Sequence, residues 1–147
     1  MRHFVVLAAV AAASALIPLG PVAAADITVK MLTKGKAGFM VFEPAFVAAK
    51  VGDVVHFVPT NPSHNAEMMK EIIPAGVALQ SGGMNKEFAL KLTAPGLYGI
   101  RCHPHYSMGM VALIQAGTKS ANIAAARAAV LPKLAAKRMS PMLSSAR

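Results

Sequence analysis

Short apolar segments separated by turn-forming residues fill the middle of this 147-residue chain and limit what it can fold into. Each segment is four to six residues long, which suits a β-strand and is too short for a helix. Gly, Pro, Asn or Asp stand in most of the gaps, and these residues favour turns. The expected strands cover residues 27–32, 39–42, 46–49, 54–58, 88–92, 97–102 and 110–115. Their spacing predicts an all-β sandwich.

The first 25 residues have a different pattern, which is typical of a secretory signal peptide. Arg2 gives a short basic start, residues 4–17 are apolar apart from Ser14, and residues 23–25 are alanines that suit cleavage. The apolar run is shorter than the ~20 residues that a bilayer span needs. We therefore predict a signal peptide at residues 1–25, export to the periplasm, and a mature chain without a membrane span.

The Ala-rich C-terminal segment, residues 118–147, predicts two helices. Ser120 suits the N-cap of a helix over residues 121–131, and Pro132 suits the start of a second helix that runs to about residue 139. Lys133, Lys137 and Arg138 fall on the polar side of this second helix. Its apolar positions favour docking on a sheet, and a basic amphipathic helix at a membrane surface is the alternative. The expected organisation is a sandwich at residues 26–117 followed by this extension.

Charge narrows the range of partners. Fifteen Lys and Arg residues against six Asp and Glu residues give a formal charge of +9, and removal of Arg2 with the signal peptide lowers it to +8. A basic exported protein favours acidic partners or anionic surfaces. Export and the lack of interleaved aromatic and basic residues argue against nucleic-acid binding.

Cys102 is the single cysteine of the chain, so it cannot form an intramolecular disulfide. In an oxidising compartment, an unpaired thiol is damaged unless it is buried or coordinated. Cys102 opens the run Cys-His-Pro-His-Tyr-Ser-Met-Gly-Met, which ends at Met110 and lies between two expected strands. A thiolate, imidazoles and thioethers form the soft ligand set that suits copper, and two His, one Cys and a distant Met make a blue-copper site.

The second histidine of such a site must come from another part of the chain. His64 lies in a polar loop just after the expected strand at residues 54–58, whereas His56 lies inside that strand. Loops at strand ends can direct side chains to one point, so His64 is the better candidate. A histidine in the middle of a strand is more often a packed or surface residue.

Within the cysteine loop, His105 is preferred to His103. Two residues separate His105 from Cys102, which lets the chain turn back, whereas adjacent side chains tend to diverge. Spacing alone does not decide between Met108 and Met110 as the thioether ligand.

Two motifs resemble the pseudoazurins, a family of periplasmic blue-copper electron carriers in the cupredoxin superfamily. Residues 51–59 followed by His64-Asn65 are similar to the strand and first-histidine loop of that family. The second motif, with Tyr98 ahead of it, is similar to the family's ligand loop and reads Cys102-x-Pro104-His105-Tyr106-x-Met108-Gly109-Met110. The Ala-rich tail resembles the family's C-terminal extension, so the resemblance covers the whole mature chain.

The resemblance implies a cupredoxin-like Greek-key sandwich of eight strands with two C-terminal helices. It implies one copper ion that alternates between Cu(I) and Cu(II), and the ligand set His64, Cys102, His105 and Met110. It also implies that the backbone N–H of Asn65 donates to the Cys102 sulfur, while the Asn65 side chain ties the two loops together. Pro104 removes one backbone N–H beside the ligands.

The resemblance further implies that electrons leave through the exposed edge of His105. The apolar patch around it would consist of Met40, Pro59, Pro104 and Met108. Basic side chains that could steer an acidic partner to this patch are Lys34, Lys36, Lys70 and Arg101. The implied partners are copper nitrite reductase or a c-type cytochrome, and a monomer is expected for such a shuttle.

Two other functions compete with electron transfer. Many methionines in an exported protein would suit copper storage or delivery, although such proteins place clustered Met and His on open loops. Cys102 could instead be an enzymatic nucleophile with His105 or His64 as its base. No Asp or Asn other than Asn65 stands out to orient such a base, so we do not expect an enzyme.

Overall fold

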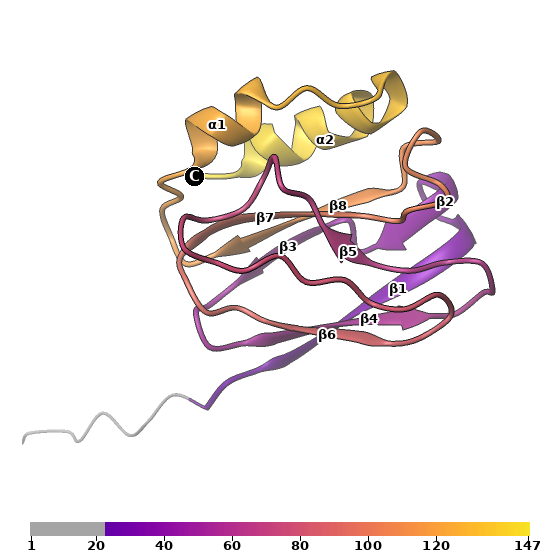
Figure 1. The fold of residues 1–147 in the computed structure, drawn as a ribbon, viewed down its shortest axis with the longest axis horizontal. Coiled ribbons are helices and arrows are strands. Elements are labelled where there is room, and N and C mark those ends of the chain that lie inside the picture. The colour runs from indigo at the N-terminus through magenta and orange to yellow at the C-terminus, as the bar shows by residue number, and fades with distance from the viewer. Residues whose placement is uncertain (1–22) are drawn as a thin grey trace, which may run out of the picture.

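The computed structural model describes residues 23–147, in which eight strands form two four-stranded sheets and two helices follow (Figure 1). The predicted signal peptide at residues 1–25 lies outside the described residues over positions 1–22. One sheet has the order β2-β1-β4-β6, and the other has the order β3-β8-β7-β5. The elements are β1 (Asp26–Gly35), β2 (Gly38–Glu43), β3 (Phe46–Ala49), β4 (Val54–Pro59), β5 (Glu67–Met68), β6 (Phe88–Lys91), β7 (Gly96–Arg101), β8 (Val111–Ala116), α1 (Ile123–Ala128) and α2 (Lys133–Ser145).

The strand order shows a Greek-key sandwich. β1 runs parallel to β4, and β3 runs parallel to β8, whereas the β1–β2, β4–β6, β5–β7 and β7–β8 pairs are antiparallel. Because parallel neighbours cannot be joined by a tight hairpin, the chain must pass between the two sheets. The predicted Greek-key sandwich with two C-terminal helices is confirmed, and each of the seven expected strands overlaps an observed one.

The core between the sheets follows from the alternation of side chains along the strands. In β1, Val29 and Met31 are fully buried while Lys30 between them is exposed. The ring of Phe57 in β4 packs edge-on against Phe42 of β2, with ring centroids 5.6 Å apart. These contacts fix the register of β1, β2 and β4, because a slip by one residue would turn the apolar side chains to solvent.

β8 is buried on both faces, which explains its unbroken apolar sequence. Its side chains divide between two clusters. Ala112 and Ile114 belong to the core between the sheets, whereas Val111 and Leu113 pack with residues of the two helices, including Met139. The helices therefore cover the outer face of the second sheet (Figure 1). No helix within residues 23–147 is long and apolar enough to cross a membrane.

The helix boundaries differ from the prediction. α1 begins at Ile123 rather than at residue 121, and Asn122 rather than Ser120 occupies the N-cap. The Asn122 side chain does not cap the helix, because its amide exchanges two hydrogen bonds of 2.9 Å with the backbone of Leu97 in β7. α2 continues past the predicted end to Ser145. Burial of Met142 beyond Pro141 outweighs the poor helix propensity of proline.

Candidate metal centre

Two loops at one end of the sandwich bring the predicted ligands together. His64 lies between β4 and β5, and Cys102, His105 and Met110 lie on the connection from β7 to β8. The cysteine follows the last residue of β7, and Met110 precedes the first residue of β8. The β-ladder between these two strands therefore fixes both ends of the nine-residue loop.

Three possible ligand atoms converge in the part of the chain that the structure describes. His64 Nδ1, Cys102 Sγ and His105 Nδ1 all lie within 4.8 Å of one another. The two nitrogens are 3.1 Å apart, and the sulfur lies 3.8 Å from His64 Nδ1 and 3.5 Å from His105 Nδ1. Metal–ligand bonds of about 2.0–2.3 Å in a trigonal plane would separate such atoms by roughly 3.5–3.8 Å. The triangle thus has nearly the size that a metal ion of this kind requires.

Burial controls the protonation of this triangle. Burial raises the pKa of the Cys102 thiol, while the backbone N–H groups of Asn65 and His105 near the sulfur act in the opposite direction. Burial, followed by the nearby His105, lowers the pKa of His64. A neutral imidazole is the form that binds a metal, and a coordinated thiol loses its proton. The lowered pKa keeps the His64 imidazole in its metal-binding form, whereas the Cys102 thiol keeps its proton until a metal displaces it.

Thr33 is a neighbour of His64 that the sequence did not reveal. Its Oγ1 lies 3.1 Å from His64 Nε2, and its backbone N–H donates to the Asn61 side chain at 3.0 Å. A hydrogen bond at Nε2 orients the ring and leaves Nδ1 free to face Cys102. Thr33 is 31 residues from His64. No local spacing rule could have paired them.

The two candidate methionines have different surroundings. Met110 is fully buried, its backbone N–H donates to the His105 carbonyl at 3.1 Å, and its carbonyl accepts from the Cys102 N–H at 3.0 Å. Met108 is 44% exposed. Because a thioether ligand must lie beside the buried sulfur, this difference favours Met110.

The Asn65 side chain joins the two loops. Its side-chain oxygen accepts a hydrogen bond of 2.7 Å from the backbone N–H of His103, beside Cys102. Pro104 follows and is exposed. The His103 ring is also exposed and lies 3.2 Å from Glu67, away from the triangle.

The basic residues predicted for docking differ in whether their charges are paired within the molecule. Lys34, Lys36 and Lys70 are exposed. Arg101 instead donates from Nε to Glu67 at 2.6 Å, and its guanidinium lies 5.0 Å from the centre of the Tyr106 ring. Its charge is therefore largely compensated within the molecule. Two members of the apolar patch predicted around His105, Met40 and Pro59, are half-buried.

His56 stays outside the site, as its position within a strand suggested. It lies on the first sheet between two carboxylates, 2.6 Å from Glu87 and 2.9 Å from Asp26. These contacts, with Glu87 first, raise its pKa.

Comparison with known proteins now identifies the family. The family model of copper binding proteins of the plastocyanin/azurin family matches residues 29–117, which span the strands and both loops. The pseudoazurin of Paracoccus pantotrophus is 51% identical over 135 residues, which cover 91% of this chain and 93% of the relative. The chain belongs to the pseudoazurin family.

The likeness extends to solved structures. The crystal structure of native pseudoazurin from Hyphomicrobium denitrificans is 42% identical and superposes with a TM-score of 0.79, covering 83% of this chain and 98% of that one. The refined structure of pseudoazurin from Methylobacterium extorquens, 41% identical, also has a TM-score of 0.79. Members of this family are copper electron carriers of the cupredoxin type. The soft donors that converge here fit copper.

Proposed function

We propose that this chain is an exported, periplasmic one-electron carrier whose copper is held by His64, Cys102, His105 and Met110. The observation that carries the proposal is the convergence of two imidazole nitrogens and one thiol sulfur at the end of the sandwich. Copper, when bound, supplies a one-electron change between Cu(I) and Cu(II). Thiolate and thioether ligands suit Cu(I) and imidazole suits both states, so one ligand set can serve the whole cycle.

Fast electron transfer needs ligands that move little between the two states. The backbone of the cysteine loop provides this rigidity, because each ligand is tied to another. The His105 N–H donates to the Cys102 carbonyl at 3.2 Å, and Met110 bonds to both of these residues. On the other loop, Thr33 holds the His64 ring. The protein thus holds the donor atoms close to their working positions.

The path for the electron follows from burial. Cys102, His64 and Met110 are fully buried, whereas His105 is partly exposed. An electron that enters or leaves through His105 therefore has the shortest route to a docked partner. The exposed Met108 and Pro104 flank it in the same loop and give a surface that a partner can approach closely.

The partner in this proposal is an acidic redox protein of the periplasm, such as copper nitrite reductase or a c-type cytochrome. The exposed Lys34, Lys36 and Lys70 and the excess of basic residues over the whole chain support it. Electrostatic attraction raises the association rate and allows rapid separation after each transfer. The burial of His64 and Cys102 argues against copper storage or delivery, which needs ligands that a receiving protein can reach.

The visible spectrum of the copper-loaded protein tests this function. We expect an intense blue colour with Cu(II) that disappears in Cys102→Ser, because the colour requires the copper–thiolate bond. Met110→Leu and Met108→Leu form a matched pair, and we expect only the former to change the spectrum and the reduction potential. A colourless protein that binds only Cu(I) would support copper storage and contradict electron transfer.

A further inference from the structure

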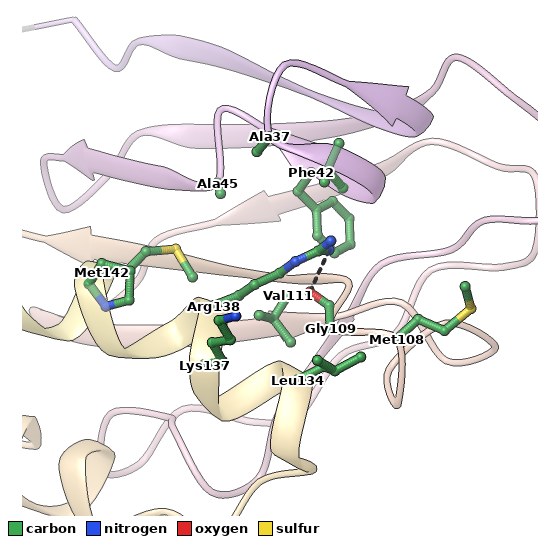
Figure 2. Close-up of a pocket in the computed structure, with 12 residues that line it drawn as sticks. Ala37, Phe42, Ala45, Met108, Gly109, Val111, Leu134, Lys137, Arg138 and Met142 are labelled. Atoms are coloured by element: carbon green, nitrogen blue, oxygen red, sulfur yellow. Dashed lines mark hydrogen bonds between the residues drawn. The ribbon is translucent and has the colours of Figure 1, made fainter.

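Arg138 lies in α2, is half-buried, and reaches from the helix toward β2 and the cysteine loop. The sequence placed it on the polar side of the helix, next to Lys137. In the structure it lines a groove of about 540 Å³ between α2, β2 and the end of the cysteine loop. Figure 2 shows the Arg138 side chain crossing from the helix toward Gly109.

The guanidinium of Arg138 binds three backbone carbonyls from two distant parts of the chain. Nη1 donates to the carbonyl of Met40 at 2.6 Å and to that of Gly109 at 3.1 Å, and Nη2 donates to the carbonyl of Phe39 at 2.9 Å. The acceptors are 29 to 99 residues away in sequence. A planar fork with five N–H donors suits this task, whereas a lysine offers a single point of attachment.

The Gly109 carbonyl and the Met110 N–H belong to one peptide group, which is therefore fixed on both sides. Arg138 binds the carbonyl, and the His105 carbonyl accepts the N–H at 3.1 Å. Gly109 has a φ of +86°, and a Cβ there would lie only 3.0 Å from the Leu134 carbonyl oxygen. The loop thus rests directly on α2, immediately before the proposed thioether ligand.

The other two carbonyls lie beside the proposed docking patch. Met40, a member of that patch, has a positive φ of 51°, a strained conformation for a residue with a side chain. Surrounding contacts must hold such a residue in place, and Arg138 donates to the carbonyls of the peptide groups on both sides of it, those of Phe39 and Met40. One side chain thus binds both the ligand loop and the surface beside it.

We propose that Arg138 is a positioning residue for the copper centre, which orients the peptide before Met110 and holds Met40 at the surface around His105. This inference rests on the proposed function, and it also gives the C-terminal helix a role. α2 does more than cover the second sheet, because it supplies the donor that sets the end of the ligand loop. Arg138 acts on the backbone of the ligand loop and is not itself a proposed ligand.

The test compares Arg138→Met with Lys137→Met. Both remove one positive charge from the same groove, but the Lys137 side chain is exposed and makes no hydrogen bond within residues 23–147. In the copper-loaded protein, we expect Arg138→Met to shift the visible spectrum and the reduction potential clearly more than Lys137→Met. In the metal-free protein, we expect hydrogen exchange of the Met110 amide to be about tenfold faster in Arg138→Met than in Lys137→Met.

Arg138→Lys keeps the positive charge and removes the planar guanidinium, so it tests whether the several N–H donors are needed. We expect the Met110 amide exchange rate and the reduction potential of Arg138→Lys to lie between those of the wild type and those of Arg138→Met. If Arg138→Met does not fold, Arg138→Lys against the wild type decides the question by the same two measurements. A folded variant with the spectrum, potential and Met110 protection of Lys137→Met would overturn the positioning role. The blue colour of the wild type would still stand, so this failure is distinct from a failure of the proposed function.

Discussion

The surroundings of Cys102 affect both its protonated form and its thiolate form. Burial raises the pKa of its thiol, so without a metal it stays protonated and poorly reactive. The backbone N–H groups of Asn65 and His105 near the sulfur lower the thiol pKa, so they favour the thiolate once a cation displaces the proton. The same surroundings thus protect the thiol when no metal is bound and favour the thiolate when one is.

His56 makes folding stability depend on pH, independently of the metal centre. Hydrogen bonds to Glu87 and then to Asp26 raise its pKa in the folded state above 6.5. The folded state therefore binds this proton more tightly than the unfolded state. The stabilisation is fully present below about pH 6.5 and is lost as the pH rises through the folded-state pKa. We expect urea denaturation to show that His56→Gln reduces stability more at pH 6 than at pH 9.

Glu87→Gln is the matched variant for this prediction, because it removes the largest cause of the shift and leaves the histidine in place. It should lower the pH dependence without abolishing it, since Asp26 remains 2.9 Å away. A constant difference between the wild type and His56→Gln from pH 6 to pH 9 would show that the ion pairs do not survive in solution.

At the level of elements, the metal centre depends on how two loops are joined. Asn65 is 6% exposed, and its side-chain oxygen accepts the backbone N–H of His103. Asn65→Ala leaves this N–H without a partner at a partly buried position. We expect a loss of about 1–3 kcal/mol in the free energy of unfolding, measured by urea denaturation of the metal-free protein.

His103→Ala is the control for the loop connection. It keeps the backbone N–H and its bond to Asn65, and it removes only a ring that is 71% exposed. We expect this variant to lose about 0–1 kcal/mol. Equal losses for Asn65→Ala and His103→Ala would mean that the imidazole, rather than the backbone bond, connects the loops.

The sequence patterns predicted those elements whose signals are local. Alternation and turn residues located seven strands, and the density of soft donors located the loop from Cys102 to Met110. β5 was not predicted, because a two-residue strand has no periodicity. Asn122 and Ser120 look alike as caps in sequence, and only contact with Leu97 in β7 determines what Asn122 does. The contacts of Arg138 have no local signal either, because its acceptors are distant in the chain.

Over the whole molecule, the few acidic side chains are mostly occupied within the fold. Glu67 binds Arg101, and Asp26 and Glu87 contact His56. Asp53 and Glu43 accept hydrogen bonds from backbone N–H groups. These carboxylates are engaged in ion pairs or hydrogen bonds within the fold, while the side chains of lysines such as Lys34 and Lys36 remain exposed. The excess of basic over acidic residues therefore gives the surface a net positive field.

Reversal of one lysine in this field tests the proposed docking. Lys36 is exposed in the turn between β1 and β2, close in sequence to Met40 of the proposed patch. We expect Lys36→Glu to lower the second-order rate constant of electron transfer to an acidic partner about three- to tenfold at low salt. Stopped-flow oxidation by copper nitrite reductase, or reduction by a c-type cytochrome, gives this constant directly.

Lys91→Glu carries the same change of charge at a different place. Lys91 pairs with Val54 at the start of β4, whereas the metal centre lies beyond the end of that strand. If docking is local, Lys91→Glu lowers the rate constant of electron transfer less than Lys36→Glu does. The difference between the two rate constants shrinks as salt is added, because the screening length is about 10 Å at 0.1 M salt and shorter at higher salt. Equal effects of the two variants would indicate that only the net charge matters. Rates that rise with salt in the wild type would refute attraction by the lysines.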